Sequence, residues 1–424
     1  MLRAFSRASV QARNRVLTSS VRSPIFIQSA NKVFRSTLTT TPIEVIEQEF
    51  KSSEESKTNS KERCRAEKQV RVWLVTMAGM VITIVVVGGL TRLTESGLSM
   101  VHWNLLGTLP PLNEQEWDVE FEKYKQFPEY KKKNVGMTKD EFKRIYYYEY
   151  IHRQLGRLVG ATYILPAIYF AARGYFSKKG LNIMPAWRAL LIGGMIGFQG
   201  LLGWYMVKSG LDENHDLMVR YNNVPRVSQY RLSSHLSTAF LIYAVMLWSA
   251  LDLDKNRKLT DPLTLKNVQM LKRWAPIVTA IMFVTAASGA FVAGMDAGLV
   301  YNEFPLMGGR LIPADALALK PTILNFFENA SMVQFQHRLL ATVTTVGVFS
   351  LYALARRGGN FHKLPKQLRV ALNSVVTVVA AQYILGITTL LTYVPTSIAS
   401  THQIGSLTLF SVLLWLTHLL KRRI

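Results

Sequence analysis

The sequence is poor in the residues that build disulfides and thiolate metal sites. It has a single cysteine, Cys64, which excludes an internal disulfide and a cysteine metal cluster. Acidic residues are also scarce, with 27 Asp and Glu against 50 Lys and Arg, a formal net charge of +23. No basic-aromatic groove pattern accompanies this charge, so we expect no nucleic-acid partner. The basic residues cluster near the N-terminus and between long apolar stretches, which indicates a membrane protein.

The first 43 residues contain no Asp or Glu, and arginines recur there among Ser, Thr and apolar residues. This composition is typical of a mitochondrial transit peptide and lacks the continuous apolar core of a secretory signal. A disordered basic tail is the alternative. Residues 44–69 are charged and low in apolar content, which predicts a solvated, matrix-facing linker.

Eight apolar stretches are long enough to cross a hydrocarbon core. With eight crossings, the five basic regions that flank them all fall on one side. By the positive-inside rule that side is the matrix and holds both termini, so we predict a multi-pass protein of the mitochondrial inner membrane. The predicted spans lie near residues 71–90, 152–173, 186–207, 231–251, 273–294, 332–355, 369–392 and 398–419.

The two halves of the sequence resemble each other. GGLTRLTESGL aligns with GAFVAGMDAGL, and IHRQLGRLVGATY aligns with QHRLLATVTTVGV. Four spans in each half make the halves point the same way. The fold class is therefore predicted to be all-α and polytopic, with tandem four-helix bundles at 70–260 and 261–424 related by a pseudo-twofold along the membrane normal.

Four histidines occupy the second and fourth span of each half, near the ends expected at the intermembrane space. Ionisable groups inside spans are costly, and four in duplicated register favour a functional role over hydrogen bonding in the core. Two facing imidazoles form the axial ligand set of a haem, whereas zinc or copper would need three or four donors at one point. Of the unduplicated histidines, only His102 is retained as a functional candidate, and the others are expected to be solvated or interfacial. The predicted haem-ligand pairs are His152 with His235 and His337 with His402.

A carboxylate distinguishes the two halves. Glu149 stands three residues before His152, on the same helical face, whereas Gln334 occupies the matching position before His337. This difference predicts that the first site reacts and the second transfers electrons. The alternative is a Glu exposed at the membrane surface.

An arginine follows the first histidine of each half directly. Arg153 and Arg338 are placed to pair with haem propionates through charge-assisted hydrogen bonds. Anchoring at the membrane interface is the alternative role.

From residue 70 to its end the chain resembles the haem A synthase family. The resemblance rests on GGLTRLTESGLSMVHWNLLGTLPP, on EYIHRQLGRLVG, and on the four histidines in alternate spans. It implies oxidation of the C8 methyl of haem O to the formyl group of haem A, used in cytochrome c oxidase. By this match His152 and His235 hold the substrate haem, His337 and His402 hold haem b, and Glu149 is the catalytic carboxylate. The cysteine pair of many bacterial members is absent from the outer loops.

The resemblance also implies partners. These are haem O from an upstream farnesyltransferase, a ferredoxin-like electron-transfer protein, cytochrome c oxidase assembly factors and membrane lipid, and a homo-oligomer stays open. Two other functions remain as alternatives. A di-haem electron-transfer cytochrome is disfavoured because all four histidines are predicted near one membrane face. A transporter with a histidine proton relay is disfavoured because the histidines lie near the span ends.

Overall fold

The computed structural model describes residues 42–211, 225–254, 266–359 and 361–421. The chain divides into a unit of Met1–Arg65 and a unit of Ala66–Ile424. The transit-peptide prediction falls almost entirely on residues outside those described. From Pro42 onward the predicted linker is helical and continues into the first span, and Thr58 to Arg65 are exposed.

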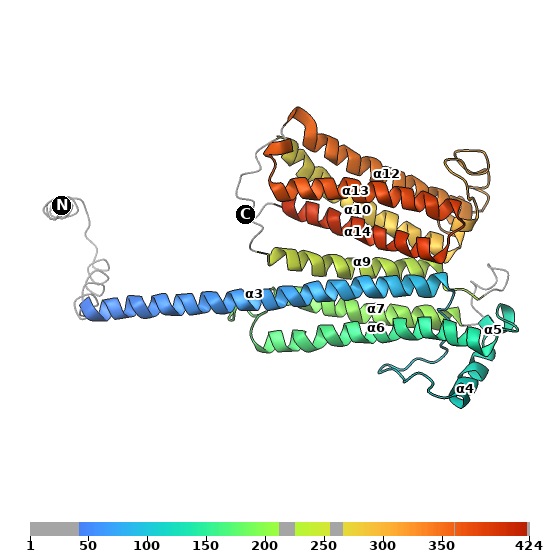
Figure 1. Ribbon diagram of the computed structural model, residues 1–424, viewed down its shortest axis with the longest axis horizontal. Coiled ribbons are helices and arrows are strands. Elements are labelled where there is room, and N and C mark those ends of the chain that lie inside the picture. Colours follow the sequence, from blue (N-terminus) through green and yellow to red (C-terminus); the bar gives the residue numbers. More distant parts are fainter. Residues whose placement is uncertain (1–41, 212–224, 255–265, 360, 422–424) are drawn as a thin grey trace. The chain divides into compact units, whose positions relative to one another are not determined.

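Within the described residues, eight helices are long and apolar enough to cross a membrane, which confirms the all-α polytopic fold. No strand occurs in these ranges beyond an isolated bridge between Met307 and Arg310. The division into bundles at 260/261 and the pseudo-twofold axis stay predictions. The eight helices, labelled in Figure 1, are α3 (Pro42–Leu93), α6 (Lys139–Ala172), α7 (Ala186–Gly210), α9 (Gln229–Asp252), α10 (Lys266–Gly294), α12 (Ala330–Arg356), α13 (Lys366–Leu391) and α14 (Thr396–Leu420).

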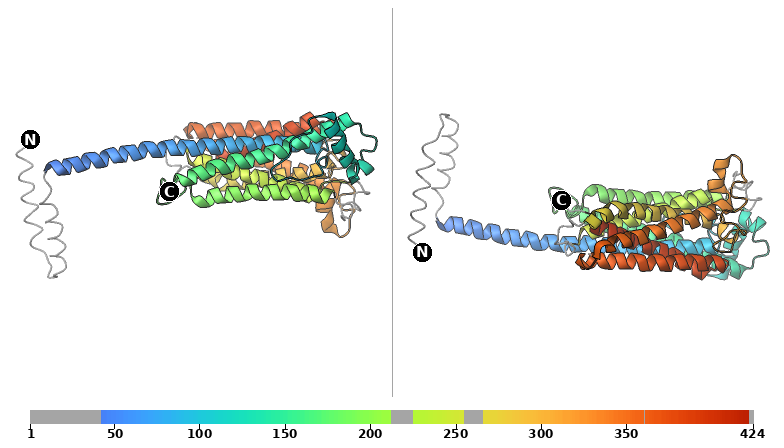
Figure 2. Two further views of the ribbon diagram at one scale, coloured as in Figure 1. Left: turned by 90° about the horizontal axis from the view of Figure 1, so that it is seen from below. Right: turned by 90° about the horizontal axis from the view of Figure 1, so that it is seen from above.

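The spans of the second unit lie side by side with their long axes nearly aligned (Figures 1 and 2). We call α3 to α9 the first half and α10 to α14 the second half. One buried apolar cluster draws residues from all eight spans. The halves meet where α9 packs on α10 and α14 packs on both. Large apolar side chains such as Leu165, Leu190 and Ile384 remain more than half exposed, as expected of surfaces that face lipid.

The first outer loop folds into a small subdomain, and we call its end of the bundle the outer end. It contains α4 (Glu114–Lys125) and α5 (Pro128–Lys132), which lie beside the start of α6 (Figure 1). Trp117, Phe121, Tyr124, Phe142 and Tyr146 form its aromatic core. These rings pack against one side of the α6 extension, so the loop and the helix hold each other in place.

Helix α6 begins thirteen residues before His152, much earlier than predicted. A capping box at Thr138 and Glu141 starts the helix by satisfying its first backbone N–H groups. Hydropathy could not place this start, because residues 139–151 are polar enough to stand above the membrane. The extension matters for function because it carries Glu149 inward, beneath the outer loop.

At the opposite, inner end one expectation was wrong. His418, expected to be solvated or interfacial, is only 8 % exposed. Its Nε2 lies 3.0 Å from Asp252 Oδ1, and its ring packs edge-on against Trp248, because α9 encloses this end of α14. His362 is exposed as expected, and His215 lies outside the described residues.

Candidate functional site

Each of the four predicted histidines lies against a glycine of a neighbouring span, close to the outer end. Any side chain at these glycines would press on an imidazole ring. The four glycines therefore allow close approach of ring and backbone. A Cβ atom would lie 2.9 Å from His152 Nε2 at Gly88, 3.1 Å from His235 Cε1 at Gly203, 3.0 Å from His337 Cε1 at Gly289, and 2.9 Å from His402 Cε1 at Gly386.

The four histidines lie in two pairs, one in each half of the chain. His152 lies within electrostatic range of His235, and His402 within range of His337. All four side chains are half-buried. In the part of the chain that the structure describes, no three His, Cys, Asp or Glu side chains gather at one point. A haem iron has two axial positions, and each pair of imidazoles could occupy both positions of one haem. The donor set therefore fits the predicted cofactor. The residue assignments remain predictions.

Hydrogen bonds from neighbouring helices hold the backbone of two of these histidines and the rings of His337 and His402, where Gln382 Nε2 lies 3.1 Å from His402 Nδ1. Gln199 donates to the His235 carbonyl at 2.9 Å, and Gln382, its match in the second half, donates to the His402 carbonyl at 2.8 Å. In the second half Ser288 Oγ also lies 2.8 Å from His337 Nδ1. Contacts from a second residue fix the direction in which an imidazole presents its other nitrogen.

Glu149 is buried, with 2 % of its surface exposed, so the alternative of an exposed surface Glu is wrong. Its Oε2 accepts hydrogen bonds from Ser99 Oγ at 2.7 Å and from the Met100 backbone N–H at 2.8 Å. Its Oε1 accepts from Arg153 Nη2 at 2.5 Å. The carboxylate is thus held by three donors, one of them a buried cation one turn along the same helix.

Arg153 is also buried, and it joins α6 to the outer loop. Its guanidinium donates to the carbonyl oxygens of Met100 at 2.7 Å and His102 at 2.8 Å. The guanidinium carbon lies 5.1 Å from the centre of the Trp103 ring. One donor, Nε, is buried without a hydrogen-bond partner. The propionate role of Arg153 stays a prediction.

The second half repeats this arrangement with an amide side chain in place of the carboxylate. Gln334 is buried and donates to the Tyr301 carbonyl at 2.9 Å, and Tyr301 occupies the position that matches Met100. Arg338 donates to the Pro305 carbonyl at 2.9 Å and lies 5.3 Å from the Phe304 ring centre. Its Nη1 is buried and has no partner. The predicted difference between Glu and Gln is therefore a difference between a buried ion pair and a buried amide.

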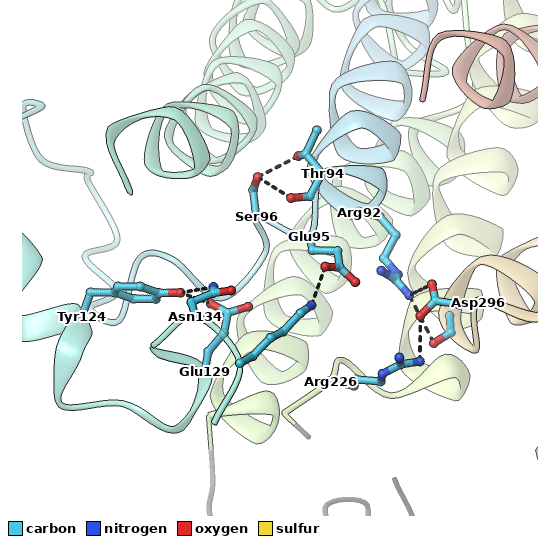
Figure 3. A network of polar contacts seen from close by, with 11 residues as sticks. Arg92, Thr94, Glu95, Ser96, Tyr124, Glu129, Asn134, Arg226 and Asp296 are labelled. Carbon is cyan, nitrogen blue, oxygen red and sulfur yellow. Dashed lines mark hydrogen bonds and ion pairs between the residues drawn. The ribbon is translucent and has the colours of Figure 1, made fainter. Parts of the chain in front are cut away.

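Ionic contacts connect the outer turns of the two halves (Figure 3). Asp296 accepts from Arg92 at 2.9 Å and from Arg226 at 2.8 Å. Glu95, which matches Asp296 in the repeat, instead pairs with Lys133 at 2.5 Å. Both acidic residues have a positive φ, 54° and 51°, so the same tight turn occurs twice.

Glu129 is a buried acid that the sequence did not single out. It is 3 % exposed and accepts a hydrogen bond from Tyr124 at 3.0 Å, while Asn134 donates to the same Tyr124 oxygen (Figure 3). Burial raises the pKa of the Glu129 carboxyl to about 7, against the opposing hydrogen bond from Tyr124. The residues next to it in sequence mix apolar and aromatic side chains with lysines, and this mixture does not mark it as buried.

Comparisons with known proteins show the family to which the chain is similar. Residues 71–414 match the family model described as Cytochrome oxidase assembly protein, COX15-CtaA. The chain is 49 % identical over 361 residues to heme A synthase COX15 of Bos taurus, which covers 84 % of this chain and 83 % of that protein. Identity to heme A synthase COX15 of Homo sapiens is 47 % over 363 residues, 84 % of each chain. The heme A synthase of the bacterium Nitrosospira multiformis is 43 % identical over 360 residues, which covers 84 % of this chain and 95 % of that protein.

Proposed function

Since this chain belongs to the COX15-CtaA family of cytochrome oxidase assembly proteins, we propose that it is a haem A synthase, which oxidises the C8 methyl group of haem O to a formyl group. The observation that carries the proposal is the buried Glu149 beside one histidine pair, with Gln334 in its place beside the other. One half is built for chemistry on its tetrapyrrole and the other is not.

In the first half, His152 and His235 would hold the substrate. The substrate's own iron supplies the oxidising chemistry when bound. Glu149 holds negative charge near that site, and its carboxylate would accept a proton or offset positive charge that develops at the methyl carbon. Arg153 and Ser99 keep the carboxylate in one position, which preserves its orientation before substrate arrives.

In the second half, His337 and His402 would hold haem b. Oxidation of a methyl to a formyl group needs electrons to be exchanged with an external carrier, and a haem held by these residues would offer a route for that exchange. Ser288 and Gln382 position its two ligands from neighbouring helices. Gln334 carries no charge and cannot accept a proton as a carboxylate does. This suits a haem in the second half that would exchange electrons without a proton transfer at residue 334.

The remaining assignments belong to the same proposal. We place the protein in the mitochondrial inner membrane with residues 1–43 as a transit peptide and both termini in the matrix. Its mitochondrial relatives and its basic inner loops support this placement. Its partners would be the farnesyltransferase that makes haem O, a ferredoxin-like electron carrier and cytochrome c oxidase assembly factors.

Pigment extraction from the purified protein tests the proposal. We expect haem O or haem A together with haem B. Haem B alone would favour a di-haem electron-transfer cytochrome, and no haem would favour a transporter. Replacing His402 with Ala should remove haem B while leaving the first site loaded, and replacing His235 with Ala should do the reverse. A full complement of both pigments in either variant would contradict the ligand assignment.

A further inference from the structure

A cavity of about 750 Å³ opens at the outer end of the first half. Its walls are residues 101–103 of the outer loop with Phe127 on one side, and the last turns of α7 on the other. Val207 lines it and lies four residues beyond Gly203, the glycine under His235, so the two share a helix face. The cavity is therefore the outward continuation of the first histidine site, about one helical turn away.

Cations and aromatic rings dominate the cavity wall. Arg153 lines it and carries the buried Nε that has no hydrogen-bond partner. The Lys208 ammonium lies 4.9 Å from the centre of the Trp204 ring, and both residues line the cavity. Trp103 forms another flat wall. None of the described residues that line the cavity is acidic, although Glu149 lies behind the wall in an ion pair with Arg153. The lining thus offers N–H donors and positive charge beside flat apolar surfaces.

The second half lacks this lining. The register that places Gly203 on Gly386 also places Trp204 on Ile387 and Lys208 on Leu391. A cation that only anchors a helix at the membrane interface would serve both halves equally. Restriction to the first half links Lys208 to a difference that the proposed function makes between the halves, an exchangeable ligand in the first site and a resident cofactor in the second.

We propose that this cavity binds the carboxylates of the tetrapyrrole substrate, with the Lys208 ammonium as the donor and Trp204 and Trp103 as flat walls. The inference rests on the proposed function, because it names a part of the same substrate site. A tetrapyrrole with two propionates has an apolar body and an anionic edge. Lys208 lies five residues beyond Gly203, about 7.5 Å along the helix axis at 1.5 Å per residue, so it stands outward of the imidazoles where that edge would emerge.

The positive charge also explains how a substrate reaches the site. A resident haem is inserted once, whereas a substrate must enter at each turnover. Cations at the mouth of a site raise the rate at which anions arrive and favour one orientation over its reverse. Lys208 would thereby direct the carboxylate edge outward and leave the opposite, isoprenoid-bearing edge in the apolar interior.

The test measures binding of two probes, iron protoporphyrin IX and its dimethyl ester, to the full-length protein in lipid nanodiscs. Esterification removes the anionic charge and leaves the ring unchanged. We expect wild-type protein to prefer the free acid at its first site. Lys208→Leu, which copies Leu391, should weaken binding of the free acid about tenfold and leave the ester unaffected, since one charge-assisted hydrogen bond is lost. Lys208→Arg should retain the preference, and Lys179→Leu, an exposed inner-end lysine, serves as the control.

Other outcomes would overturn the inference. Equal weakening of both probes would assign Lys208 a structural role, and no change in either would leave it an interfacial anchor. Unchanged probe binding with slower reduction by an added acidic electron carrier would make the cavity a protein docking site. These results are distinguishable from failure of the proposed function, because they read the binding of a probe and not the conversion of haem O.

Discussion

Removing one partner of the buried Glu149–Arg153 pair should destabilise the protein strongly. Both side chains are almost fully buried and their charged atoms lie 2.5 Å apart. Glu149→Gln keeps an oxygen for Ser99 and Met100 but turns an amide N–H₂ toward Arg153, which leaves the guanidinium charge uncompensated. Breaking a buried ion pair in this way costs about 3–5 kcal/mol. We expect about 3 kcal/mol, because Arg153 keeps its two backbone carbonyl partners.

A double-mutant cycle separates this structural loss from chemistry. Arg153→Met alone should also destabilise, while Glu149→Gln with Arg153→Met should lose about 2 kcal/mol less than the sum of the two single changes. Thermal denaturation in one detergent measures the stability term, and haem extraction measures output. If Glu149 is catalytic, the double variant accumulates haem O although it loses less stability than the two single changes predict together.

Two results would refute this reasoning. Restored haem A in the double variant would reduce Glu149 to a partner of Arg153. Additive losses of stability would mean that the pair is not coupled. Gln334→Glu is the matched control in the second half, and it should change haem A output far less than Glu149→Gln.

Three further predictions concern other parts of the molecule. Because the pKa of Glu129 is raised from 4.5 to about 7 by burial, against its hydrogen bond from Tyr124, the folded state binds the extra proton and stability should fall by roughly 3 kcal/mol as pH rises through that window. Glu129→Gln should flatten this pH dependence in thermal melts, and an unchanged slope would contradict the assignment. Gly289→Ala should lower the bis-imidazole haem absorption by crowding its histidine, whereas Gly79→Ala, with nothing within 4 Å, should not. Protease added to mitoplasts should spare the 356–369 loop, and cleavage there would contradict the matrix orientation.

The eight spans could be predicted from the sequence because the lipid bilayer requires a single, easily recognised composition. A span must be about 20 residues of mostly apolar composition, and that signal is local. The histidines could be found for a related reason, since a polar group repeated in register within apolar helices stands out without tertiary information. The glycines beneath them carry a usable signal too. Gly88 and Gly289 begin the aligned outer-end segments, and Gly203 and Gly386 match in the repeat.

Contacts between the outer loop and α6 could not be predicted, because they join residues far apart in sequence. Glu149 was assigned to the face of His152 from a spacing of three. Arg153 follows Glu149 by four residues, and side chains four apart on a helix are as close as side chains three apart. Sequence alone therefore does not say whether Glu149 contacts His152 or Arg153. Burial favours the contact with Arg153, because the aromatic core of the outer loop covers this turn of α6. The same subdomain buries Glu129, which three lysines follow at residues 131–133.

The two histidine sites are alike at the imidazole rings and the glycines beneath them, and they differ where they meet the outer loops. Gly88 faces His152, and the adjacent Gly89 leaves no room for a side chain against Gln403, the residue after His402. Gln403 donates to the Val85 carbonyl at 3.0 Å, so one turn of α3 is held between both sites. If the two histidine pairs bind haems as proposed, this contact would fix the separation between them, which electron transfer requires. Chemistry could then be added to one site only, by changing the outer loop and the residues beneath it, without disturbing the ligands that both halves share.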